Sequence, residues 1–132
     1  MKKIIVPVAV LAAVVLIMMF SLKTEKDGGL TLAVLQAEAA ETGKPMVVQF
    51  TSDGCITCRK MKPALEKIEA EGGERYSLKV VDVDINTGIA IELGITAVPV
   101  QLFISEEGEI LKKNLGYLSY KDFTDIFSEF SI

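Results

Sequence analysis

The sequence contains no histidine and only two cysteines among its 132 residues. Without histidine, a Cys–His or Ser–His catalytic dyad is excluded, and the commonest metal ligand is missing. Two cysteines are too few for a zinc site, which needs four ligands, unless two chains pool their thiolates. We therefore expect neither a metal ion nor another cofactor.

A concentration of positive charge is also missing. The formal net charge is −4, and the lysines and arginines form no basic stripe of the kind that phosphate binding requires. Nucleic acid is therefore not an expected partner, and the mildly acidic composition indicates a soluble domain surface. The length allows one compact domain, which we expect to be a monomer.

One long apolar segment is present near the amino-terminal end. Residues 4–20 carry no charge and follow Lys2 and Lys3. As a helix they would span about 26 Å, close to the roughly 30 Å of a bilayer's hydrocarbon core. Residues 18–22 fit an A-x-A-like cleavage site poorly. We therefore favour a retained signal anchor over a cleaved signal peptide.

These features divide the chain into three parts. Residues 1–22 are expected to form a signal anchor with one transmembrane helix, residues 23–29 a polar linker that ends in glycines, and residues 30–132 the globular domain. Lys2 and Lys3 favour the cytoplasmic side. This predicts a single-pass protein of the cell (inner) membrane whose domain faces the periplasm or the extracellular side.

Hydrophobic periodicity in residues 30–132 predicts alternating helices and strands. In the first helix, we expect Leu30, Val34, Ala37 and Glu41 to share one side. The order α-β-α-β-α-β-β-α predicts a largely parallel sheet that is covered on both faces and carries an antiparallel hairpin at one edge. The expected helices are 30–42, 55–70, 86–93 and one that Ser119 caps, with Phe123, Ile126, Phe127 and Phe130 on its apolar face, and the expected strands are 46–50, 76–83, 100–104 and 109–115.

The two cysteines stand in the segment Cys55-Ile56-Thr57-Cys58, where a strand and a loop lead into a helix. Free backbone N–H groups and the positive end of the helix dipole favour a thiolate on the first cysteine. The spacing lets the second cysteine close a disulfide, and in this context the motif indicates redox chemistry. Arg59 stands where haem attachment would need a histidine. A static structural disulfide remains an alternative.

Several segments, the cysteine motif among them, follow a known pattern. They are VVQF at 47–50, CITC at 55–58, KMKP at 60–63, VDVD at 81–84 and GITAVP at 94–99, with Gly108 and Gly116 in the final hairpin. Together they resemble the thioredoxin family over roughly residues 30–132. The resemblance implies a thioredoxin-like three-layer α/β/α sandwich with a mixed four-stranded sheet, preceded here by the transmembrane helix.

The resemblance also implies roles for particular residues. Cys55 would attack a substrate disulfide, and Cys58 would resolve the mixed disulfide. Pro99 would follow a cis peptide bond beside the pair, with the backbone of Val98 offered to an extended substrate strand and Gly54 as a further substrate-binding position. Without the resemblance, Pro99 would be interpreted as a strand-entry proline in trans.

Three departures from the family pattern affect the expected activity. Gly54 stands where the family usually has tryptophan, and Gln49 replaces a buried acid and cannot take a proton from the second cysteine. Both argue against fast, general protein reduction. Ile56 and Thr57 replace the usual Gly-Pro and supply no cation beside the first cysteine, which argues against a strongly oxidising disulfide.

These features predict an extracytoplasmic, membrane-tethered thiol–disulfide oxidoreductase. The favoured activity is that of a reductase whose partners are protein disulfide substrates. Its compartment is oxidising, so a membrane electron transporter would have to re-reduce it. A thiol oxidase of the same fold remains an alternative. So does a non-catalytic binding module that uses the groove beside Pro99.

Overall fold

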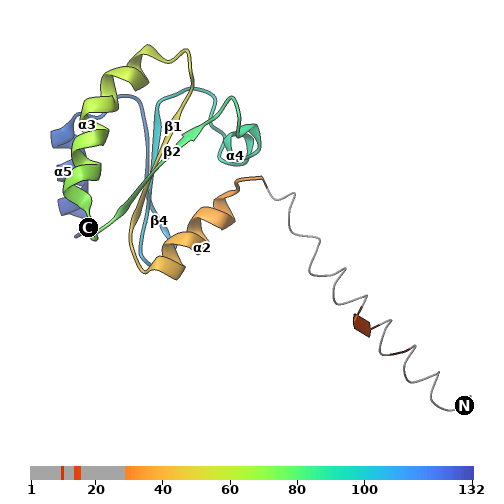
Figure 1. Cartoon of the computed structure of the whole chain (residues 1–132). Coiled ribbons are helices and arrows are strands. Elements are labelled where there is room, and N and C mark those ends of the chain that lie inside the picture. Colours follow the sequence, from red (N-terminus) through yellow and green to blue (C-terminus); the bar gives the residue numbers. More distant parts are fainter. Residues whose placement is uncertain (1–9, 11–13, 16–28) are drawn as a thin grey trace, which may run out of the picture.

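The computed structural model describes Val10, Val14, Val15 and residues 29–132. The helices are α2 (Leu32–Thr42), α3 (Ile56–Gly72), α4 (Thr87–Glu92) and α5 (Tyr120–Glu129), and the strands are β1 (Met46–Thr51), β2 (Ser77–Asp82), β3 (Val100–Ile104) and β4 (Ile110–Leu115) (Figure 1). The predicted order of these elements is confirmed, and their ends differ from the predicted ones by at most two residues.

The four strands form one mixed sheet in the order β2-β1-β3-β4. β1 and β2 are parallel, whereas β3 is antiparallel to both β1 and β4. The prediction of a largely parallel sheet is therefore wrong. The chain that follows α4 turns before Pro99 and enters the sheet against the direction of β1, and the alternation of helices and strands does not reveal that turn. The antiparallel hairpin of β3 and β4 at one edge is confirmed.

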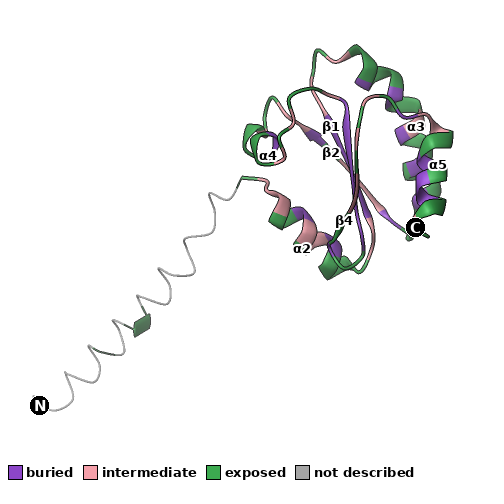
Figure 2. Ribbon diagram, turned by 180° about the vertical axis from the view of Figure 1, so that it is seen from behind, coloured by how far each residue is buried: buried purple, intermediate pink, exposed green. Residues whose placement is uncertain are grey.

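Helices cover both faces of the sheet, which confirms the three-layer sandwich. α2 and α4 lie over one face, and α3 and α5 lie over the other (Figure 1). Because side chains alternate between the two faces of a strand, β1 contributes to both cores. Val48 and Phe50 pack with Leu35 of α2, whereas Val47 packs with Met61 of α3. The two central strands, β1 and β3, are accordingly the most buried part of the sheet, whereas the edge strands β2 and β4 are more exposed (Figure 2).

The buried side of α2 is formed by Leu35 and Ala39. Val34 is 46% exposed, and Ala37 and Glu41 are exposed as well, so the predicted side of this helix is wrong. Alanine is frequent all round α2, so the apolar residues do not mark one side clearly. The periodicity of the sequence therefore could not select the side that faces the sheet.

The last helix forms as predicted. Ser119 is the N-cap of α5 and shares a capping box with Asp122. The apolar face is confirmed, because Phe123, Ile126 and Phe127 are buried in the core on the α3 side of the sheet.

Most of the predicted signal anchor at 1–22 and most of the linker at 23–29 lie outside the described residues. Within the described part of the chain, no helix is both long and apolar enough to cross a bilayer. The anchor and its orientation therefore stay predictions.

Candidate redox site

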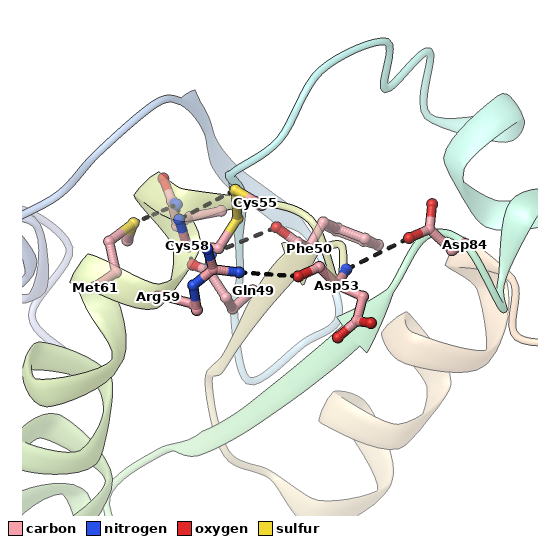
Figure 3. Close-up of a disulfide and its surroundings, with 9 residues drawn as sticks. Gln49, Phe50, Asp53, Cys55, Cys58, Arg59, Met61 and Asp84 are labelled. Atoms are coloured by element: carbon pink, nitrogen blue, oxygen red, sulfur yellow. Dashed lines mark hydrogen bonds between the residues drawn. A yellow bond between two sulfur atoms is a disulfide. The ribbon is translucent and has the colours of Figure 1, made fainter.

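Cys55 and Cys58 are joined by a disulfide, and their Cα atoms lie 5.2 Å apart (Figure 3). Cys55 is the N-cap of α3, and its sulfur accepts a hydrogen bond from the backbone nitrogen of Cys58 at 3.1 Å. Cys55 is partly exposed, whereas Cys58 is only 7% exposed. A second protein can therefore reach the first sulfur more readily than the second.

The start of α3 sets the electrostatics around Cys55. The first N–H groups of a helix lack partners within the helix, and its N-terminal end carries a partial positive charge. The first turn of α3 contains no acidic side chain that would oppose this charge. These surroundings stabilise a thiolate on Cys55 once the disulfide is reduced.

A short loop between β1 and α3 holds Cys55 at the end of the sheet. The backbone nitrogen of Cys55 donates to the carbonyl of Ser52 at 3.2 Å. The guanidinium of Arg59 donates to the carbonyl of Asp53 at 3.1 Å, and the backbone nitrogen of Asp53 donates to the carboxylate of Asp84 at 3.4 Å (Figure 3). Contacts from α3 and from the turn that follows β2 thus fix the loop.

The Val98–Pro99 peptide bond is cis, as predicted. The next residue, Val100, pairs with Phe50 near the end of β1, so Pro99 lies at the same end of the sheet as the loop to the cysteines. Among the described residues, the backbone N–H and C=O groups of Val98 have no hydrogen-bond partner. They are therefore free to pair with an extended segment of another chain.

Gly54, Ile56 and Thr57 form an open rim beside the cysteines, and none of these three residues carries a charge. Gly54 is exposed, and a Cβ atom at this position would meet no atom within 4 Å. Ile56 is 62% exposed and Thr57 is exposed. The missing tryptophan thus leaves the approach to the disulfide unobstructed.

Gln49 is 1% exposed on the face of the sheet that α3 covers (Figure 3). Its carboxamide oxygen accepts a hydrogen bond from Nε2 of Gln101 at 3.0 Å, and its nitrogen donates to the carbonyl of Phe50 at 3.4 Å. Because this amide is neutral, it neither takes a proton from Cys58 nor adds a charge beside it.

A pocket of about 350 Å³ lies between α3 and the sheet and reaches Cys58 and Gln49. Apolar side chains make up much of its wall, and charged side chains of α3 lie along it. The residues that line it are Gln49, Thr51, Cys58, Arg59, Lys62, Leu65, Glu66, Glu69, Leu78 and Val80. In the described part of the chain, no group of three or more Cys, Asp or Glu side chains could hold a metal ion.

Two further amides, Gln101 and Asn114, continue across the sheet from Gln49 and were not predicted from the sequence. Gln101 is fully buried and faces Gln49 across β1 and β3. Asn114 faces Gln101 across β3 and β4 and donates to its carboxamide oxygen at 2.7 Å. The available signal was the single polar residue, Gln101, within the otherwise apolar strand Val100–Ile104.

The fold and the Cys55–Cys58 disulfide define a redox protein of the thioredoxin-like class. The family model Thioredoxin matches residues 30–129, and the chain belongs to the thioredoxin family. This confirms the resemblance found in the sequence. Membership of the family together with the CxxC pair supports thiol–disulfide oxidoreductase activity.

Several relatives show how far the similarity extends. The chain is 34% identical over 107 residues to the thioredoxin-like protein HCF164, chloroplastic, of Oryza sativa subsp. japonica, and 36% identical over 108 residues to that of Arabidopsis thaliana. These matches cover 74% of this chain but 40% and 41% of those proteins, so the chain spans about two fifths of their length.

Thioredoxins themselves are matched over most of their length. The chain is 29% identical to the thioredoxin of Listeria monocytogenes over 91 residues, which is 68% of this chain and 87% of that protein. The X-ray structure of Fasciola hepatica thioredoxin has a TM-score of 0.64 and 29% identity, and the match covers 75% of this chain and 93% of that one.

Proposed function

We propose that this protein is an extracytoplasmic, membrane-tethered oxidoreductase that reduces protein disulfides through Cys55 and Cys58. The observation that carries the proposal is the asymmetry of the pair. One sulfur is partly exposed at the start of α3, and its partner is buried. A static disulfide would not need this arrangement, whereas an attacking and a resolving thiol need it.

The reaction follows from this asymmetry. In the reduced protein, the thiolate of Cys55 attacks a substrate disulfide, forms a mixed disulfide and releases one substrate thiolate. Cys58, once deprotonated, attacks the sulfur of Cys55 and releases the second substrate thiolate. Two electrons thus pass from the cysteine pair to the substrate. A membrane electron transporter then supplies two electrons to reduce the pair, because the compartment is oxidising.

Substrate binding is assigned to Val98, Pro99 and Gly54. The backbone groups of Val98 would pair with an extended segment that carries the substrate cysteine. Gly54 leaves room for that segment, because no atom lies within 4 Å of a Cβ at this position. Ile56 and Thr57 carry no charge, so shape and apolar contact would contribute to substrate selection at this part of the rim.

The experiment that tests this function is a disulfide-reduction assay with the pre-reduced full chain in detergent. We expect the protein to reduce a protein disulfide and to end with Cys55 and Cys58 oxidised, and the Cys55→Ser variant to stay at the background rate. A protein that oxidises dithiols but reduces no disulfide would be an oxidase of the same fold. A protein that does neither, yet binds partners equally well after Cys55→Ser, would be a binding module.

A further inference from the structure

Three carboxamides form a continuous row across three neighbouring strands. Gln49 on β1, Gln101 on β3 and Asn114 on β4 face one another in register. Asn114 donates to the oxygen of Gln101 at 2.7 Å, and Gln101 donates to the oxygen of Gln49 at 3.0 Å. At one end of this amide row, Gln49 lines the same pocket as Cys58.

The amide row has one direction, because its outer contacts are groups that only accept hydrogen bonds. Asn114 also donates to the carbonyl of Gly116 at 3.5 Å, and Gln49 donates to the carbonyl of Phe50 at 3.4 Å. The thioether of Met61 accepts from the central amide at 3.7 Å. Turning one amide over would bring two oxygens or two N–H groups together, so the row determines on which side of Gln49 the nitrogen lies.

The nitrogen of Gln49 has a hydrogen to spare. One of its two hydrogens is directed to Phe50, and the other has no partner among the described residues. A buried N–H group is costly to leave unpaired, and a thiolate is a much stronger acceptor than a disulfide sulfur. Reduction of the disulfide would create such an acceptor at Cys58.

We propose that Gln101 and Asn114 are positioning residues for the redox pair, which hold the nitrogen of Gln49 available to the thiolate of Cys58. The inference rests on the proposed function, in which Cys58 is the resolving thiol. Apolar burial raises the pKa of a thiol, and a hydrogen bond to the thiolate lowers it. The amide row thus lets a neutral donor stabilise the charged form of Cys58.

Other charges around Cys58 also affect its titration. Most of these charged residues belong to α3, to the loop before it and to the turn after β2. One more lies on β4, on the same face as Asn114, and it forms an ion pair with a residue of α5. These residues are Arg59, Lys62, Glu66, Glu69, Asp53 and Asp84, with the Lys112–Glu129 pair on β4 and α5. All of them stay unchanged in the variants below.

The test measures the pKa of Cys58 in full-length Cys55→Ser protein by the ultraviolet absorbance of the thiolate. Serine at position 55 can still cap α3, and Cys58 is then the only thiol. We expect Gln101→Leu to raise the pKa by about one unit, a tenfold loss of thiolate below the pKa. Asn114→Leu, at a less buried position, should shift the pKa in the same direction by less. Leu102→Val, on the opposite face of β3, should lower stability without moving the pKa.

A double-mutant cycle separates positioning from general loosening of the fold. If Gln101 acts through Gln49, Gln101→Leu should have no further effect on the pKa once Gln49→Leu is present. The proposal would be overturned if Gln101→Leu shifted the pKa of Cys58 equally with Gln49 and with Leu at position 49. It would also be overturned if neither Gln101→Leu nor Asn114→Leu shifted that pKa. Because the titration needs no substrate, its outcome is independent of the disulfide-reduction assay, in which failure of the unsubstituted protein would instead reject the proposed function.

Discussion

The sulfur of Cys55 accepts the backbone N–H of Cys58 at 3.1 Å and is also the atom bonded to the sulfur of Cys58. The N-cap of α3 and the exposed end of the disulfide are therefore the same atom. When the disulfide is reduced, the charge develops where the N–H groups and the dipole of α3 stabilise it. This relationship supports the proposed roles, in which Cys55 is the nucleophile and Cys58 resolves the mixed disulfide.

Single substitutions test these two roles. We expect Cys58→Ser to accumulate mixed disulfides through Cys55, because the resolving thiol is gone. Cys55→Ser should trap none, because the thiol that remains is buried. Non-reducing electrophoresis of both variants after exposure to oxidised substrate proteins measures the difference. Equal trapping by both variants, or by neither, would show that the roles are wrongly assigned.

The second prediction concerns a carboxylate at position 49. Gln49→Asp removes the hydrogen bond to Phe50 and buries an acid, so the free energy of unfolding should fall by about 1–3 kcal/mol. Thiol–disulfide exchange near neutral pH should nevertheless become faster, because the carboxylate can accept the proton of Cys58. A denaturant titration and a disulfide-reduction assay measure the two effects.

Gln49→Leu is the control, because it also removes the hydrogen bond to Phe50 but adds no base. It should lower stability without accelerating exchange. If Gln49→Asp were slower than the unsubstituted protein and equally stable, a carboxylate at position 49 would not act as the base that accepts the proton of Cys58.

The third prediction concerns the cap of α5. The hydroxyl and the backbone N–H of Ser119 both donate to the carboxylate of Asp122. These hydrogen bonds, of which the one from the hydroxyl has the larger effect, hold the pKa of Asp122 below its usual value. A lowered pKa in the folded state means that the charged cap stabilises the fold above the unfolded-state value of about 4, and that this contribution is lost as the pH falls through the folded-state pKa. Asp122→Ala should therefore destabilise the protein at neutral pH and less in acid.

Urea titrations of the unsubstituted protein and Asp122→Ala at neutral and acidic pH measure this difference. Asp125→Ala is the control, because Asp125 lies on the same helix and pairs with Lys121 at the surface instead of capping the helix. If the effect of Asp122→Ala were as large in acid as at neutral pH, the charge of the cap would not contribute to stability.

The fourth prediction concerns topology. The uncharged residues 4–20 after Lys2 and Lys3 should form an uncleaved anchor with the domain outside the cytoplasm. Amino-terminal sequencing of membrane fractions and a reporter fused after Ile132 measure the two claims separately. A mature protein that starts near residue 22 would reject the anchor. A reporter active only in the cytoplasm would reject the orientation.

The parts of the fold that depend on local chemistry could be predicted from the sequence. The cysteine motif at the start of a helix, the cap at Ser119 and the cis bond before Pro99 were anticipated. Each of them follows from a short run of residues or from the family pattern. Predicting these features did not require knowing which distant residues contact them in the folded protein.

The parts that depend on long-range pairing could not be predicted. The reversed direction of β3 is set by how the chain returns after α4, and the buried side of α2 is set by contact with the sheet. The amide row was missed for the same reason. Gln49, Gln101 and Asn114 are far apart in the sequence and become neighbours only through the register of three strands.

The reduction potential of the Cys55–Cys58 couple in the full-length protein tests the central claim most directly. Equilibration against dithiol and glutathione redox buffers measures it. The absence of a cation at Ile56 or Thr57 predicts a reducing couple near that of thioredoxin, roughly −270 mV. A potential near that of strong oxidants, roughly −120 mV, would contradict the account and assign the protein to disulfide formation instead.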